Sequence, residues 1–236
     1  MSETNSLEQP VGNPVPDWTP RSLPARTSLH GRWCRLEPLS AERHADALFD
    51  ANAADRAGAM WTHMAYGPFP DREHYCAWAA DAAAGDDPLF YAVIPAALGT
   101  PAGVAAFMRI TPGHGVLEIG NIAFAPVLQG TAVATEALSL MIRHAFDVLG
   151  YRRVEWKGDA LNTASRRAAL RLGFTFEGIF RQHMIVKGRN RDTAWYAMTD
   201  ADWPSLRDAH ARWLDPANFD ADGRQRTRLS DLTASA

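Results

Sequence analysis

The sequence has little cysteine and no excess of basic residues, and each shortage excludes a class of protein. Cys34 and Cys76 are the two cysteines among 236 residues, too few for a disulfide framework or a metal-binding pattern. Lys and Arg number 24 against 27 Asp and Glu, so the chain lacks the basic balance typical of nucleic-acid binding. We therefore expect no nucleic-acid partner, no metal, and a reducing compartment, the cytoplasm, as the location.

Long apolar runs are also missing. The N-terminal residues include Glu3, Glu8 and several prolines, so we expect neither a signal peptide nor a membrane-spanning helix. The patterns Gly-x-x-x-x-Gly-Lys-Ser/Thr and Gly-x-Gly-x-x-Gly are absent as well, which argues against the two common kinds of nucleotide-binding loop. What the chain does have is an apolar share of 47%, enough for the sizeable core of one domain.

One stretch in the middle of the chain organises the rest. Val116 to Phe124 is mainly apolar and β-branched, which predicts a central strand that Pro126 ends. From Gly130 to Leu149 apolar residues recur every three or four positions, which predicts a helix that Gly150 can end. Backbone N–H groups of residues 129–134 would lie unpaired at the positive end of this helix, which favours an anion such as a phosphate.

The elements expected on either side indicate the fold class. A strand, two helices and two further strands precede the central strand; another strand, a short helix and a hairpin follow the long helix. This order predicts an α/β (α+β) fold with a mixed sheet flanked by helices. Residues 29–214 are expected to form the domain, and the proline-rich residues 1–28 and polar residues 215–236 to be disordered, although Trp18 could dock on the domain.

The central stretch also resembles a known motif. Ile122-Ala-Phe-Ala-Pro126, followed by Gln129-Gly-Thr-Ala-Val-Ala-Thr-Glu-Ala137, is similar to the acetyl-CoA-binding segment of the GCN5-related N-acetyltransferase (GNAT) superfamily. Its Ala-Thr-Glu-Ala ending is similar to the RimJ/RimL-like branch. One departure is Ala132, which stands where the family most often has Gly. The resemblance implies the GNAT fold and acetyl-CoA as acyl donor, bound by Ile122, Ala123, Phe124, Gln129, Gly130, Thr131, Ala132, Val133, Ala134 and Thr135.

A second stretch strengthens the resemblance. Asn162 precedes Ser165 by three residues, and the short helix that they begin ends in Leu172-Gly-Phe174. This is similar to the family's second cofactor segment, where two parallel strands splay apart. The resemblance implies that Asn162 binds the pantetheine arm and that Ser165 offers its hydroxyl to the cofactor sulfur. The alternative is that Asn162 is only a helix N-cap and that Ser165 fills the first turn.

The resemblance implies direct transfer of an acetyl group to a primary amine. An α-amino group has a pKa of about 7.7–8.0, so one base is sufficient to remove its proton. Glu118 on the central strand is our candidate base, with an ion pair as the alternative reading, and Glu155 and Asp159 compete for the role. Three histidines are interpreted as isolated, without a partner at metal or triad spacing: His63, His114 and His183.

Several further assignments stay open at this level. The acceptor amine is either a protein N-terminus, as the RimJ/RimL likeness implies, or a small amine, amino acid or antibiotic, and the protein is a monomer or homodimer. A non-catalytic CoA-binding or regulatory module with the same fold is the alternative function. Trp61, His63, Tyr66, Phe69 and Trp78 either wall the acceptor pocket or pack in the core. Arg166, Arg167 and Arg171 either reach the adenosine phosphates or form a solvated helix face.

Overall fold

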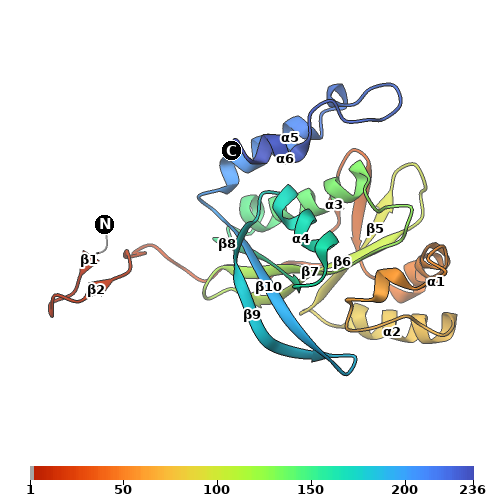
Figure 1. Cartoon of the computed structure of the whole chain (residues 1–236), viewed down its shortest axis with the longest axis horizontal. Coiled ribbons are helices and arrows are strands. Elements are labelled where there is room, and N and C mark those ends of the chain that lie inside the picture. Colours follow the sequence, from red (N-terminus) through yellow and green to blue (C-terminus); the bar gives the residue numbers. More distant parts are fainter. Residues whose placement is uncertain (1–2) are drawn as a thin grey trace.

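An eight-stranded sheet forms the centre of the computed structural model, which describes residues 3–236 (Figure 1). The strand order is β3-β4-β5-β6-β7-β8-β10-β9. β7 and β8 are parallel, and the other neighbours are antiparallel. The predicted mixed α/β sheet is therefore confirmed.

The elements follow the predicted order closely. The strands of the sheet are β3 (Leu29–His30), β4 (Cys34–Pro38), β5 (Leu89–Pro95), β6 (Gly103–Thr111), β7 (Val116–Phe124), β8 (Arg153–Asp159), β9 (Thr175–Val186) and β10 (Arg189–Thr199). The α-helices are α1 (Ala41–Asn52), α2 (Arg72–Ala84), α3 (Ala132–Arg143), α4 (Thr163–Arg171), α5 (Trp203–Trp213) and α6 (Leu229–Thr233).

Side-chain caps decide where the helices begin. Ser40, Asp71, Thr131 and Asn162 each accept a hydrogen bond from the backbone N–H three residues later. Such caps satisfy N–H groups that have no partner within the helix. The helix predicted from Gly130 therefore begins after the Thr131 cap, at the first residue of α3.

The end of the central helix differs from a regular α-helix. α3 is followed directly by a π-helical turn, His144–Val148, which the periodicity did not predict. Gly150 then takes a φ of 67°, a left-handed conformation that glycine adopts without steric cost. The predicted end of the helix at Gly150 is confirmed.

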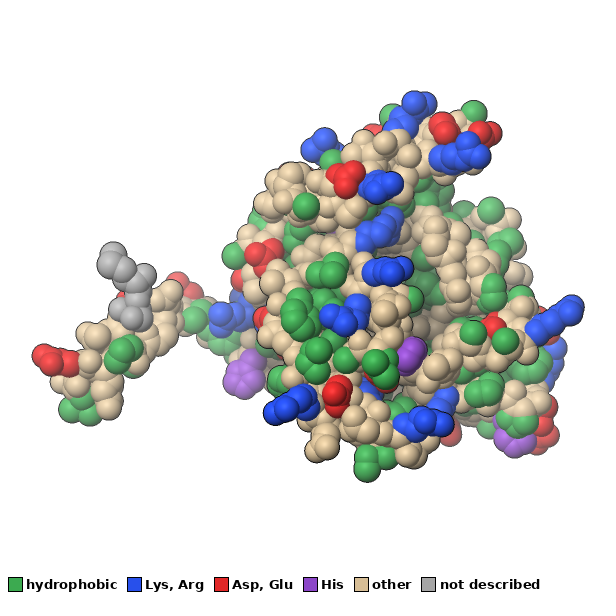
Figure 2. All heavy atoms as spheres, viewed as in Figure 1, with side chains coloured by type: hydrophobic (Ala, Val, Ile, Leu, Met, Phe, Trp, Pro, Cys, Tyr) green, Lys and Arg blue, Asp and Glu red, His purple; other side chains and the backbone are tan. Residues whose placement is uncertain are grey.

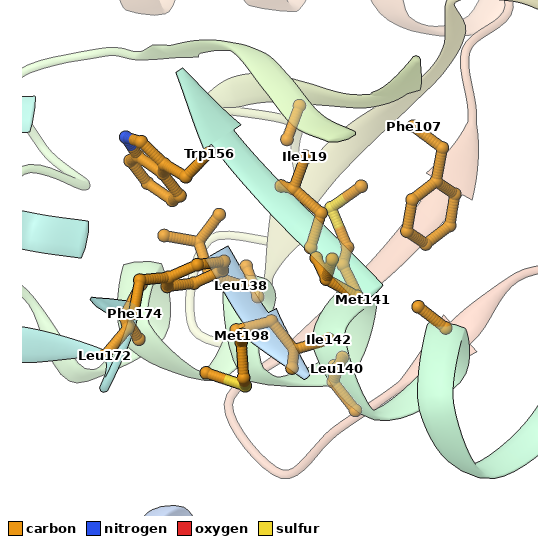
Figure 3. Close-up of a cluster of buried hydrophobic side chains, with 14 of the residues drawn as sticks. Phe107, Ile119, Leu138, Leu140, Met141, Ile142, Trp156, Leu172, Phe174 and Met198 are labelled. Atoms are coloured by element: carbon orange, nitrogen blue, oxygen red, sulfur yellow. The ribbon is translucent and has the colours of Figure 1, made fainter. Parts of the chain in front are cut away.

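Helices cover both faces of the sheet. α3, α4 and α5 bury one face, and Figure 3 shows part of that cluster, where side chains of α3, β7 and β8 meet. α1 and α2 pack on the opposite face through residues such as Leu48 and Tyr75. β5, in the middle of the covered region, is buried at every position, as expected of a strand covered on both sides. Residues of β7 thereby lie between two packed layers, with Leu117 and Ile119 in one and Ala123 in the other.

The N-terminal residues divide into two parts. The strands β1 (Glu3–Thr4) and β2 (Pro10–Val11) form an exposed hairpin that projects from the domain (Figure 1). Trp18 docks by donating its indole N–H to the carbonyl of Gly113 at 2.8 Å, as expected, and Ser22 accepts from the Tyr151 hydroxyl. The part that begins at Trp18 thus contacts the domain, whereas residues 1–2 lie outside the described residues.

The C-terminal residues also contact the domain. Leu229 of α6 is fully buried in the cluster with α3, α4 and α5. Phe219 packs edge-on against Trp33 and Trp213, with ring centroids 5.4 and 5.2 Å apart, and the Trp213 indole N–H bonds to Gln225. A few apolar anchors hold this otherwise polar segment against the domain.

Candidate functional site

The parallel strands β7 and β8 separate part-way along their length. They pair from Val116 opposite Arg153 to Glu118 opposite Glu155, and no pairing follows. Beyond that point β8 stays paired with β10, and β7 with β6. The facing edges of the two strands therefore carry backbone groups that can bind an extended, amide-bearing ligand.

A bulge lies on the open part of β7. Ala123 pairs with Val104, but Gly120 pairs with Ala106, so one more residue is present on β7 than on β6. Asn121 within this bulge takes a φ of 50°. Bulges of this kind redirect backbone groups next to functional sites. The predicted cofactor residues Ile122, Ala123 and Phe124 follow immediately.

The turn before α3 offers fewer free donors than predicted. Among residues 129–134, three N–H groups are already bonded: Gln129 to the Pro126 carbonyl, Thr131 to the Leu128 carbonyl, and Ala134 to the Thr131 hydroxyl. The expectation that all of these N–H groups are free is wrong for those three. Gly130, Ala132 and Val133 have no N–H partner among residues 3–236, which leaves a smaller set of amides for an anion at the helix start.

Side chains of the same turn hold its shape. Gln129 donates from Nε2 to the Phe124 carbonyl at 2.9 Å, which ties the turn to the end of β7. Gly130 has a φ of 72°, and open space surrounds the position where a Cβ would stand. The Thr131 hydroxyl donates to the Leu128 carbonyl at 2.7 Å, and Thr135 donates to the Thr131 carbonyl. Hydrogen bonds within the chain thus fix the shape of the turn.

Asn162 and Ser165 lie where α4 begins, beside the last residues of β8. The Asn162 side-chain oxygen caps the Ser165 N–H at 3.0 Å, so the N-cap reading is correct for that oxygen. Its side-chain N–H groups make no hydrogen bond within residues 3–236. The Ser165 hydroxyl accepts from the Trp156 indole N–H at 2.9 Å and lies 3.1 Å from where a Gly158 Cβ would be. Ser165 therefore keeps a hydrogen to donate.

Glu118 lies in a buried cluster of charges. Its Oε2 is 3.3 Å from Lys157 Nζ and 3.1 Å from Arg109 Nε, and Lys157 is also 2.6 Å from Glu155 Oε2. Burial raises the pKa of Glu118, and the two cations oppose that rise. The ion-pair reading of Glu118 thus describes the structure, while the raised pKa leaves the carboxylate able to accept a proton.

His63 has a partner that the sequence did not reveal. Its Nδ1 lies 3.5 Å from Oδ2 of Asp159, the last residue of β8, so the interpretation of His63 as isolated is wrong. Asp159 Oδ1 accepts the Leu161 N–H at 2.8 Å, which orients the carboxylate. Lys187, in the turn between β9 and β10, donates to the Trp61 carbonyl and ties the His63 loop to that hairpin. The pair lies at the end of the opened strand.

The aromatic residues of the α1–α2 region mainly form core. Trp61 is buried, and Tyr66 stacks on Trp78 with ring centroids 4.7 Å apart. Phe69 packs against the same rings. The Tyr66 hydroxyl is 3.5 Å from the Asn121 carbonyl, so this cluster also contacts the bulge of β7. The core interpretation is therefore correct for these rings.

Glu136 is a residue whose role the sequence did not indicate. Its carboxylate accepts backbone N–H groups of Arg32, Trp33 and Cys34 at 2.7, 2.7 and 2.8 Å. A Cβ on Gly31 would collide with the same carboxylate, so a larger residue there would displace it. The Glu of the Ala-Thr-Glu-Ala sequence thus anchors the turn between β3 and β4 on α3.

Comparison with known proteins identifies the family. The profile of the acetyltransferase (GNAT) domain matches residues 34–175. The chain belongs to the GNAT acetyltransferases. A GCN5-related N-acetyltransferase structure from Brucella melitensis is 49% identical, with a TM-score of 0.91 over 92% of this chain and 99% of that one.

Two curated proteins of Bacillus subtilis (strain 168) are more distant. The uncharacterised N-acetyltransferase YoaA is 31% identical over 41% of this chain and 54% of its own length. A candidate ribosomal N-acetyltransferase, YdaF, is 28% identical over 44% and 57%. The chain thus spans only about half the length of the curated relatives that it matches.

A further solved structure is similar to this chain in fold. The microcin C7 self-immunity acetyltransferase MccE, in complex with acetyl-CoA and AMP, is 21% identical, with a TM-score of 0.63 over 72% of this chain and 93% of that one.

Within residues 3–236 no group of three or more His, Cys, Asp or Glu side chains is placed to hold a metal ion. Across the same residues no helix is long and apolar enough to cross a membrane.

Proposed function

We propose that this GNAT acetyltransferase transfers the acetyl group of acetyl-CoA to a primary amine by direct attack. The observation that carries the proposal is the opening between β7 and β8, flanked by free N–H groups at the start of α3 and by Ser165 on α4. The free amides of Gly130, Ala132 and Val133 suit a pyrophosphate. The open strand edges and the Asn162 amide suit the pantetheine arm.

The chain's own residues supply what the reaction needs. The amine nitrogen bonds to the thioester carbon, the carbon–sulfur bond breaks, and the sulfur leaves as a thiolate. A backbone N–H of β7 near Phe124 stabilises the oxyanion, since such donors act best where charge develops. Ser165, whose oxygen already accepts from Trp156, donates a hydrogen bond to the departing thiolate and keeps its proton.

The amine must also lose a proton. We propose Glu118 as the base, acting through water, because burial raises its pKa toward the range useful for proton transfer. The His63–Asp159 pair is the second candidate, since Asp159 can hold His63 with Nε2 free to accept. Substitution of Glu118 and of His63, each in turn, distinguishes the two candidate bases.

For the acceptor, we propose a protein N-terminus. The name of YdaF and the Ala-Thr-Glu-Ala likeness to the RimJ/RimL-like branch support this choice. A non-catalytic CoA-binding module with the same fold is the second candidate, favoured by the pairing of Glu118 with Lys157 and Arg109.

Release of free thiol from acetyl-CoA tests the proposal directly. The purified chain is incubated with acetyl-CoA and N-terminal peptides of ribosomal proteins, and in parallel with amino acids, aminoglycosides and simple alkylamines. Peptide-dependent thiol release supports the proposed acceptor, and release with small amines alone replaces it. If acetyl-CoA binds but no amine releases thiol, the non-catalytic module is the better description.

A further inference from the structure

Arg171, the last residue of α4, carries a charge without an acidic partner. No carboxylate among residues 3–236 forms an ion pair with it, and one N–H group, on Nη1, donates to the Thr135 hydroxyl at 2.9 Å. The other guanidinium N–H groups have no acceptor in that part of the chain. Burial lowers the pKa of Arg171, because the charged form loses water without gaining a counterion. A cation in this state gains stability from an anionic ligand.

The C-terminal segment, residues 203–236, holds Arg171 in place. The Trp213 ring of α5 lies under the guanidinium, 4.7 Å from ring centroid to Cζ. Gln225 fixes that indole by accepting its N–H at 2.8 Å, and Thr233 donates to the Arg171 carbonyl at 3.3 Å. These contacts restrict the rotamers of Arg171 before any ligand arrives, which reduces the entropy lost on binding.

Arg171 is directed to the start of α3. The Thr135 hydroxyl that accepts from Arg171 itself donates to the carbonyl of Thr131, the N-cap residue. The free N–H groups of Ala132 and Val133 precede Thr135 by three and two residues, roughly 3–5 Å along the helix axis. The guanidinium and these amides therefore flank the same end of α3.

We propose that Arg171 binds a phosphate group of coenzyme A and that the C-terminal segment is part of the cofactor site. The proposal rests on the proposed function. Guanidinium groups bind phosphate oxygens with two parallel hydrogen bonds, which a main-chain turn alone does not offer. The segment lies beyond residues 34–175, which match the family profile. Figure 2 shows a row of Lys and Arg side chains running from the C-terminal helices across the centre of this face.

Coenzyme A carries phosphates in two places, the pyrophosphate and the ribose 3′-phosphate. Calorimetry of wild type and Arg171→Gln with CoA and with 3′-dephospho-CoA separates them. Arg143→Gln is the control, because Arg143 is an exposed arginine in the last turn of α3, at the opposite end of that helix. For CoA, we expect the Kd of Arg171→Gln to rise roughly tenfold to a hundredfold. The Kd of the control should stay within about threefold, as for an exposed charge.

The two ligands then identify the phosphate. If Arg171→Gln weakens binding of CoA but not of 3′-dephospho-CoA, Arg171 contacts the 3′-phosphate. If the variant weakens binding of both ligands equally, Arg171 contacts the pyrophosphate. Arg171→Gln that binds both ligands as tightly as wild type overturns the inference. A wild-type chain that binds neither ligand overturns the proposed function itself, so the two failures are distinct.

A double-mutant cycle excludes an indirect effect through the fold. Trp213→Leu removes the stacking surface and should weaken CoA binding in the wild-type background but much less in the Arg171→Gln background. If Trp213→Leu costs the same in both backgrounds, its effect does not pass through Arg171 and the role given to the segment is wrong. If Arg171→Gln does not fold, Arg171→Lys replaces it in the cycle. Because lysine keeps the charge, Arg171→Lys should give a smaller loss of CoA affinity.

Discussion

The indole N–H of Trp156 donates to the hydroxyl oxygen of Ser165 at 2.9 Å, linking β8 to the first turn of α4. Because the indole can only donate, the serine hydrogen must point elsewhere. The Ser165 oxygen lies beside Gly158, close to the open edge of β8. The pair thus leaves the serine hydrogen free to be donated to the cofactor sulfur that we propose lies nearby.

Ser165→Ala should lower kcat more than it weakens cofactor binding. Loss of a hydrogen bond to the thiolate costs about 1–3 kcal/mol, which is roughly tenfold to a hundredfold in rate. Steady-state kinetics with the amine found by thiol release, together with calorimetry for acetyl-CoA, measures both effects. Trp156→Phe, which leaves the serine in place but removes its partner, should give a smaller loss. If Ser165→Ala keeps the wild-type kcat, Ser165 serves only the helix.

Glu118→Gln and His63→Gln distinguish the two candidate bases. A general base contributes about 10²–10⁴-fold, so substitution of the true base should lower kcat/KM by at least roughly a hundredfold. If Glu118 is the base, Glu118→Gln should remove the acidic limb of the pH–rate profile while His63→Gln retains it. The opposite pattern assigns the role to His63, in which case Asp159→Asn should reproduce part of the loss. Unchanged profiles in both variants would exclude both residues.

Much of the fold could be predicted because its signals are local. The caps at Ser40 and Asn162 and the stop at Gly150 each depend on neighbours within a few residues. The candidate site is different. His63 pairs with Asp159, and Glu136 accepts the Trp33 N–H. The residues of each pair lie about a hundred positions apart, and no spacing in one sequence reveals such contacts.

The C-terminal segment shows a second limit. Polar composition predicted disorder after α5, whereas in the structure Leu229 is buried and Phe219 packs against Trp213 of α5. Composition averages over a segment, whereas docking depends on whether a few apolar side chains meet a complementary surface. That surface is formed by α3, α4 and α5 and does not exist before the chain folds.

His210 makes the stability of the fold depend on pH. Its Nε2–H donates to the Leu172 carbonyl and its Nδ1 accepts from Ser139, so the neutral ring is fully bonded. Burial lowers the pKa of His210 to about 4 from 6.5, aided by the nearby charge of Arg171. Between pH 6.5 and about pH 4 the His210 ring therefore binds a proton in the unfolded chain but not in the folded chain. The free energy of unfolding falls as the pH drops through this range, by roughly 3 kcal/mol in total.

Thermal denaturation of wild type and His210→Gln at pH 7.5 and pH 5 measures this contribution. Gln keeps a donor and an acceptor but does not titrate, so the loss of Tm on acidification should be smaller in the variant. Other groups titrate in both proteins and cancel in the comparison. Equal losses of Tm would show that His210 is not the source of the pH dependence.

Ala132 occupies the most informative position of the turn. Its N–H is one of the three free amides at the start of α3, and the residue is packed partly against the core. If a pyrophosphate binds these amides, a side chain much larger than methyl has no room beside it. Ala also favours the first helical turn over Gly by roughly 0.5–1 kcal/mol, which offsets a slightly longer phosphate contact. Ala132→Gly should therefore change the Kd for acetyl-CoA by less than about tenfold.

Ala132→Leu should exclude the pyrophosphate, because a side chain much larger than methyl would stand beside the free Ala132 N–H. Calorimetry with acetyl-CoA measures binding in both variants, and Tm measured without ligand controls for folding. Ligand-induced stabilisation should disappear in the Leu variant, since the shift in Tm follows the occupancy of the folded state. A Leu variant that binds as tightly as wild type would place the cofactor away from the Gly130–Val133 amides and so contradict the site proposed for this chain.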